Sequence, residues 1–124
     1  MIPRRALLTG LLVLTSVACS TSPSPPPVQP GPGRATRIDG EAARALVAGG
    51  ALLLDVRTPA EFAQGHIEGA RNTPLDQLDR HVAALPRDVP VVIYCASGRR
   101  SDVAARRMAT AGFDARDLGG IGRW

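Results

Sequence analysis

Short apolar runs alternate with helix-forming segments from residue 36 onward, and this alternation constrains the fold more than any other feature. The runs ALLLDV (51–56) and VPVVIYC (89–95) lack polar alternation, which is typical of strands buried on both faces. A helix-start signal follows each run. Parallel strands connected through helices need this order, so the sequence predicts an α/β fold, a mostly parallel sheet flanked by helices on both faces.

The boundaries of the other elements follow from capping and breaking residues. Thr58 is expected to cap a short helix, with Pro59 at its first position and Glu61 completing a capping box. A second Thr-Pro pair predicts a helix over 73–85, with leucines and a valine on one face. The remaining expectations are a helix at 41–48, a helix from Ser101 to Gly112, and short strands at 36–38, 70–72 and 114–118, the last at an edge of the sheet.

Residues 1–19 have the features of an export signal. MIPRR carries two positive charges, the next twelve residues are mainly apolar, and small residues precede Cys19. A signal that ends at a cysteine resembles the bacterial lipoprotein signal, in which that cysteine becomes the acylated first residue of the mature chain. We therefore expect Cys19 to be lipidated and the protein to lie on the outer side of a bacterial membrane. The alternatives are plain cleavage, which gives a periplasmic or secreted protein, and an uncleaved anchor.

Residues 20–34 are predicted to form a disordered tether, because this stretch is rich in Pro, Ser and Gly and holds six of the eleven prolines. An inert leader is the alternative interpretation. The globular domain is then expected to cover residues 35–124.

The charge pattern argues against a nucleic-acid partner. All 15 basic residues are arginine, and they are interleaved with 11 acidic residues in runs no longer than two. Removal of the signal with Arg4 and Arg5 leaves only a small positive excess. Such a balance of positive and negative charges does not require a polyanionic partner.

Cys95 lies where the second apolar strand passes into a helix. Gly98 permits a backbone conformation that other residues resist, and Ser101 is the predicted N-cap. A loop of this kind can direct several backbone N–H groups at one point, which favours an anion and lowers the pKa of a thiol placed there. Arg99 and Arg100 add positive charge. The loop therefore suits a thiolate, a persulfide or a small oxyanion, and the alternative is a buried structural cysteine.

The motifs D-V-R before E-F, G-H-I-x-G-A, C-x-x-G-x-R-S and L-G-G-x-x-x-W, at residues 55–124, resemble those of single-domain rhodaneses. The resemblance implies a five-stranded sheet and a nucleophilic Cys95 that carries sulfur as a persulfide. It also implies active-site residues, namely the loop residues Ala96, Ser97, Gly98, Arg99, Arg100 and Ser101 with supporting Asp55, Arg57, Glu61 and His66.

By this resemblance the protein is a sulfurtransferase that moves sulfur from a donor such as thiosulfate to cyanide, a thiol or a protein partner. The C-x4-R loop is shorter than the C-x5-R loop of phosphatases with this fold, which favours sulfur over phosphate. The alternative is a non-catalytic binding or persulfide-carrier module that acts with a protein partner. We expect no cofactor, no metal and a monomer.

The supporting residues are expected to have structural roles and not catalytic ones. Arg57 and Glu61 lie four apart and could pair with each other, and Asp55 could orient the backbone or Arg57. A hydrogen-bonding His66 is favoured over a catalytic base, and His81 is expected to face solvent. Relatives usually continue beyond the position of Trp124, which is therefore expected to be only partly buried.

Overall fold

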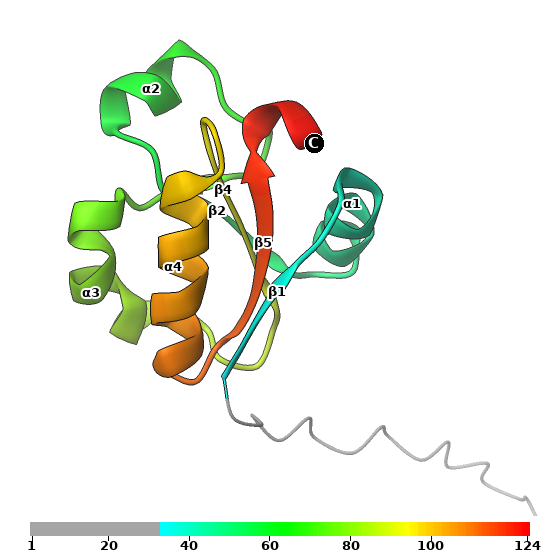
Figure 1. Ribbon diagram of the computed structural model, residues 1–124, viewed down its shortest axis with the longest axis vertical. Helices are drawn as coiled ribbons and strands as arrows, with labels where there is room; N and C mark the ends of the chain where they lie inside the picture. The colour runs from blue at the N-terminus through cyan, green and yellow to red at the C-terminus, as the bar shows by residue number, and fades with distance from the viewer. Residues whose placement is uncertain (1–32) are drawn as a thin grey trace, which may run out of the picture.

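The computed structural model describes residues 33–124 (Figure 1). The predicted signal at 1–19, with Cys19, and residues 20–32 of the predicted tether lie outside the described residues. The first described strand begins at Arg34, two residues before the strand predicted at 36–38.

Five parallel strands form a single sheet in the order β1-β5-β4-β2-β3, which confirms the predicted fold class. The prediction of 114–118 as an edge strand was wrong, because β5 lies between β1 and β4 and is hydrogen-bonded on both sides. The strands are β1 Arg34–Arg37, β2 Leu52–Asp55, β3 Arg71–Asn72, β4 Val91–Cys95 and β5 Asp114–Gly120.

Helices connect the strands, and α1 and α2 match their predicted starts closely. Helix α1 begins at Gly40, one residue before its predicted start. Helix α2 has Thr58 as its N-cap, with the capping box to Glu61 present. The predicted helix at 73–85 was wrong as a continuous helix. Hydrogen bonds to the Asp55 and Val56 carbonyl groups hold Thr73 and Leu75, so regular turns begin only at Leu75. The helices are α1 Gly40–Ala48, α2 Pro59–Gln64, α3 Leu78–His81 and α4 Arg99–Thr110, and the 3₁₀ turns are η1 Leu75–Gln77, η2 Val82–Ala84 and η3 Ile121–Arg123.

The sheet is covered on both faces, with α3 and α4 on one side and α1 on the other (Figure 1). Successive side chains of a strand point to opposite faces of the sheet, so the core has two parts. Leu54 and Ile93 pack towards α4, with Met108 and Phe113, whereas their neighbours on the same strands pack towards α1. Within residues 33–124, no helix combines the length and apolar character needed to cross a bilayer.

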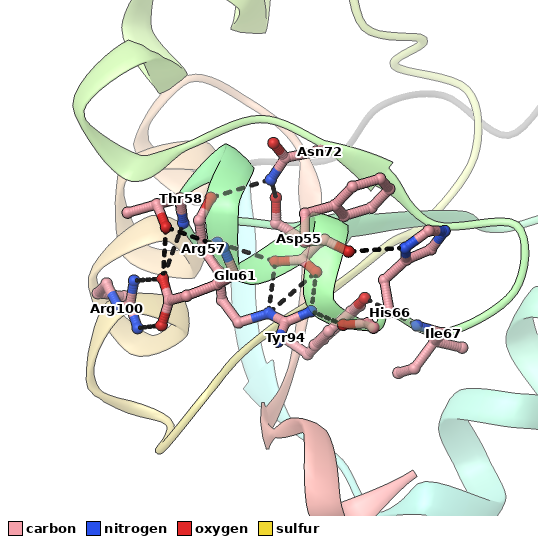
Figure 2. Close-up of polar contacts among 11 residues, drawn as sticks. Asp55, Arg57, Thr58, Glu61, His66, Ile67, Asn72, Tyr94 and Arg100 are labelled. Atoms are coloured by element: carbon pink, nitrogen blue, oxygen red, sulfur yellow. Dashed lines mark hydrogen bonds and ion pairs between the residues drawn. The ribbon is translucent and has the colours of Figure 1, made fainter.

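A buried ion pair lies at the carboxyl end of β2, where the chain leaves the sheet (Figure 2). The Asp55 carboxylate has no solvent exposure and receives hydrogen bonds from the Arg57 side chain at 2.7, 3.0 and 3.1 Å and from its backbone N–H at 2.9 Å. Arg57 also donates to the Gly65 carbonyl at 2.7 Å, which ties the far end of α2 to β2. The Asp55–Arg57 pair confirms the expectation that Asp55 orients this arginine.

Tyr94 and Asn72 extend this network to the neighbouring strands (Figure 2). The Tyr94 hydroxyl accepts a hydrogen bond from the Ile67 N–H at 3.1 Å, and burial is the main cause that raises the pKa of Tyr94 to about 12. The Asn72 amide donates to the carbonyl groups of Asp55 and Arg57. All buried side-chain N and O atoms among the described residues have a partner.

We predict that Asp55→Ala lowers the free energy of unfolding by about 3–5 kcal/mol, because it leaves the Arg57 guanidinium buried without its counter-charge. Asp114→Ala is the matched control. Asp114 also accepts two hydrogen bonds from an arginine two residues on, but its side chain is 40% exposed, so the loss should stay within about 1 kcal/mol. Chemical denaturation of both variants measures the difference, and equal losses would contradict the role given to the buried pair.

Candidate active site

Cys95 is the last residue of β4, the middle strand of the sheet, and its side chain has no solvent exposure. Its Sγ accepts a hydrogen bond from the Gly98 N–H at 2.9 Å. It forms no disulfide within residues 33–124. The sulfur therefore lies at the carboxyl edge of the sheet and directly before α4, as the sequence predicted.

The loop reaches α4 through Gly98, not through the predicted cap. Gly98 occupies the N-cap position with φ 101°, a left-handed conformation that strongly favours glycine, and α4 begins at Arg99. The prediction of Ser101 as N-cap was wrong, since Ser101 is buried in the first turn of α4. Its hydroxyl donates to the Gly98 carbonyl at 3.1 Å and so closes the loop from inside.

Two opposing effects set the protonation of Cys95. Burial by itself raises the pKa of the thiol, but hydrogen bonds from Ser101, Gly98 and Ser97 more than offset it, so that the pKa lies below its ordinary value. The Ser101 hydroxyl lies within hydrogen-bond distance of the Gly98 and Gly119 carbonyl oxygens, so we attribute the effect mainly to the backbone N–H groups. The site therefore favours a thiolate.

Strand β5 holds the loop from its other side. A Cβ atom on Gly120 would lie 2.8 Å from the Ala96 carbonyl oxygen, so only glycine allows this approach. A register shift in β5 opposite Ile93 and Tyr94 brings Gly119 and Gly120 to this position. The buried Asp117 carboxylate accepts a hydrogen bond from the Gly119 N–H at 2.9 Å and fixes the shift.

Arg100 is paired with Glu61, not free (Figure 2). Its guanidinium donates to the two carboxylate oxygens of Glu61 at 2.7 and 2.9 Å, which joins the first turn of α4 to α2. The predicted pair between Arg57 and Glu61 was wrong, because Arg57 turns inward to Asp55. Hydrogen bonds from Arg100, and then from Thr58, hold the pKa of the Glu61 carboxyl well below its usual range.

The structure also describes the other residues that the sequence analysis singled out, which are His66, His81, Arg99 and Trp124. His66 is exposed, stacks on the Phe62 ring, and has its Nδ1 2.9 Å from the Phe62 carbonyl oxygen, which is a structural role. His81 is exposed on α3, and Trp124 is partly buried, as expected. Arg99 is exposed and forms no ion pair with another described residue.

The sequence interpretation missed three residues that shape the site, namely Tyr94, Asp117 and Gly120. The L-G-G motif was a signal for Gly120, but its function is a close contact with a loop more than 20 residues away. Among residues 33–124, no group of three or more His, Cys, Asp or Glu side chains could hold a metal ion.

We predict that Gly120→Ala displaces the loop, because its new Cβ would clash with the Ala96 carbonyl oxygen. The N–H groups then move away from Sγ, so the titration midpoint of the Cys95 thiol rises and stability falls by about 1–3 kcal/mol. Gly122→Ala is the control, since a Cβ there meets no atom within 4 Å. Thiolate absorbance against pH measures the midpoint, and an unchanged midpoint in Gly120→Ala would contradict this role of β5.

Sequence comparison finds a matching family model and related proteins. The model of the rhodanese-like domain matches residues 39–124. The chain is 38% identical over 77 residues to the thiosulfate sulfurtransferase GlpE of Stutzerimonas stutzeri, covering 62% of this chain and 71% of that protein. It is 44% identical over 62 residues to a sulfurtransferase of Allochromatium vinosum, covering 50% of this chain and 58% of that protein.

A solved structure agrees with these matches. The rhodanese-like domain protein from Staphylococcus aureus superposes with a TM-score of 0.63 at 27% identity, over 73% of this chain and 90% of that one. Three observations on the present chain agree: the order of its sequence motifs, its all-parallel sheet, and the family match over residues 39–124. The chain belongs to the rhodanese-like domain family.

Proposed function

We propose that the protein is a sulfurtransferase that carries sulfur as a persulfide on Cys95. The observation that supports this most directly is the Gly98 N–H donated to Sγ at the start of α4, in a loop that lowers the pKa of the thiol. A structural cysteine needs no such donor. Relatives named as sulfurtransferases, GlpE of S. stutzeri among them, support the same class of activity.

In the first half-reaction, the Cys95 thiolate attacks the outer sulfur of a donor such as thiosulfate. A bond forms between Sγ and that sulfur, the S–S bond of thiosulfate breaks, and sulfite leaves with the electron pair. Cys95 becomes a persulfide anion and the total charge is conserved. The backbone N–H groups of the loop stabilise the anionic sulfur before and after transfer, as preorganised donors do in other active sites.

In the second half-reaction, an acceptor attacks the outer sulfur of the persulfide. With cyanide, a carbon–sulfur bond forms, the persulfide S–S bond breaks, and thiocyanate leaves while the Cys95 thiolate is regenerated. Two successive transfers through one covalent intermediate give ping-pong kinetics.

The two loop arginines have different functions in this proposal. Arg100 is neutralised by Glu61 and acts as a positioning residue that holds the start of α4 against α2. Arg99 is exposed and forms no ion pair with a residue in 33–124, so its charge attracts the anionic donor through solvent. Added salt screens such a charge and raises the KM for thiosulfate.

The sulfur is closed off from solvent in this state, so the donor requires a local movement of the loop. Ala96 and Ser97 beside it are exposed and have small side chains, and a small displacement of this segment opens the site. A small donor is therefore favoured over a bulky one. The short C-x4-R loop favours a sulfur atom over a phosphate group for the same steric reason.

The direct test is sulfur transfer from thiosulfate to cyanide by wild type and Cys95→Ser. We expect wild type to gain about 32 Da on Cys95 after thiosulfate, the mass of one sulfur atom, and to form thiocyanate with ping-pong kinetics. Cys95→Ser should lose both properties while its unfolding curve stays close to that of wild type, because the two side chains have similar size.

Full activity in Cys95→Ser would overturn the persulfide mechanism. A folded wild type that neither gains mass nor forms thiocyanate would overturn the proposal in favour of a binding or carrier module with a protein partner.

We also propose that Cys19 is acylated and that residues 20–32 tether the domain to the outer side of a bacterial membrane. The support is the apolar run that ends in VAC before a Pro/Ser-rich stretch. Cys19→Ser is expected to move the protein from the detergent-extracted membrane fraction to a soluble fraction without loss of folding. If wild type and Cys19→Ser both fractionate as soluble, the lipid anchor is wrong.

A further inference from the structure

The Arg37 side chain reaches from β1, at the edge of the sheet, to the loop that holds Cys95. Its Nη2 lies 3.6 Å from the point that a Cβ atom on Gly98 would occupy, and 3.7 Å from the corresponding point on Gly119. Since the Gly98 N–H donates to Sγ at 2.9 Å, bond lengths place Nη2 within about 10 Å of the sulfur. This is about one Debye length at roughly 0.1 M ionic strength, so a charge at this position acts on the sulfur.

Asp117 joins Arg37 to the loop, with one carboxylate oxygen for each. Its Oδ2 accepts a hydrogen bond from Arg37 at 3.1 Å, and its Oδ1 accepts one from the Gly119 N–H at 2.9 Å. A Cβ atom on Gly98 would lie 3.4 Å from the Cα of Gly119, and the Ser101 hydroxyl lies 3.4 Å from the Gly119 carbonyl oxygen. The carboxylate therefore holds the part of β5 that packs directly against the loop.

This use of a carboxylate has an electrostatic cost. The Asp117 side chain is only 5% exposed, so water screens its negative charge poorly, and a negative charge near a thiolate destabilises that thiolate. The Arg37 side chain is 57% exposed and supplies the opposite charge at the same place. The pair as a whole is neutral, so the hydrogen bond to Gly119 is made without a net charge beside the sulfur.

The other charged residues around the loop are either paired or positive. Arg37 and Asp117 line a cavity of about 200 Å³ together with Asp102 and Arg106, which pair with each other. Arg123 reaches Gly119 from η3, with its Nε 3.7 Å from the same Cβ point. The remaining groups are the pairs Asp55–Arg57 and Glu61–Arg100 and the exposed Arg99. Asp117 is therefore the carboxylate whose neutralisation at the loop depends on β1.

We propose that Arg37 is a positioning residue for Cys95, which neutralises the buried carboxylate that holds the loop and so prevents repulsion of the anionic sulfur. Removal of the arginine charge leaves a negative group beside the sulfur. Removal of the carboxylate charge leaves a positive one. The two changes therefore have opposite effects on the thiolate, and their consequence for turnover rests on the proposed function.

The test is a titration of the Cys95 thiol by its thiolate absorbance. It uses Cys19→Ser as the parent protein, because Cys95 is then the single cysteine of the chain. We expect Arg37→Gln to raise the midpoint by about 0.3–1 pH unit and Asp117→Asn to lower it by a similar amount, as for one charge about 10 Å away. The asparagine oxygen can still accept from Gly119, so the loop keeps its support. The double variant should return close to the parent.

The sign of the shift separates this role from a structural one. If the pair only stabilised the fold, either single change would loosen the loop, move its N–H groups away from Sγ and raise the midpoint. Arg37→Lys keeps the positive charge and should stay closer to the parent than Arg37→Gln does. A midpoint that rises in both single variants, or that does not change in Arg37→Gln, would overturn the inference.

Arg116→Gln and Asp114→Asn are the matched controls, since these two residues also form an ion pair on β5. They lie four and six residues before Gly120, which is the strand partner of Cys95, and this separation is about 13–20 Å along a strand. Both variants should leave the midpoint unchanged. A shift in Arg116→Gln as large as that in Arg37→Gln would indicate an effect of net charge alone and would overturn the inference.

Kinetics with thiosulfate separate failure of this inference from failure of the proposed function. The acid limb of kcat/KM against pH reports ionisation of the free enzyme, so it should move with the thiol midpoint in each variant. Opposite midpoint shifts in a protein that forms no thiocyanate would support the role of Arg37 and overturn only the proposed function. Formation of thiocyanate with the same acid limb in Arg37→Gln as in the parent would overturn the inference and leave the proposed function standing.

Discussion

The ion pair between Asp55 and Arg57 is the interaction on which the arrangement of the site depends. Arg57 donates to the Gly65 carbonyl as well as to Asp55, so it fixes α2 against the end of β2. The position of α2 in turn fixes Glu61, whose carboxylate is shared between the Thr58 cap and Arg100. The buried Asp55–Arg57 pair therefore fixes the position of α2. Through the Glu61–Arg100 pair, α2 in turn fixes the first turn of α4.

The sulfur environment shows how a core position can favour a charged group. Cys95 packs among apolar residues of the α4 side of the sheet, where a thiolate without hydrogen bonds would be unstable. The backbone N–H groups at the start of α4 reverse this preference, and no arginine of residues 33–124 donates a hydrogen bond to Sγ. Polarity at the sulfur is thus supplied by the main chain, while Arg100 pairs with Glu61.

Local signals predicted the fold class, the strands around Leu54 and Ile93, and the capping box at Thr58, because each depends on neighbours in sequence. The resemblance implied a set of site residues, and the structure pairs two of them, Glu61 and Arg100. The partner of Arg100 was not predictable from spacing, since its pair with Glu61 spans 39 residues. The central place of β5 and the contact of Gly120 with the loop depend on strand order, which no local pattern encodes.

Strand order also has a consequence for how the chain folds. Within residues 33–124, β1 pairs only with β5, with Arg34 opposite Asp114 and Arg37 opposite Asp117, and β5 is the last strand of this range. Strand β1 therefore has no place in the sheet until β5 has joined β4. Contacts of such sequence separation carry a large loop-closure cost and slow the folding of a domain. The complete sheet therefore forms only after β5 has been synthesised, so until then this edge of the sheet lacks its outer strand.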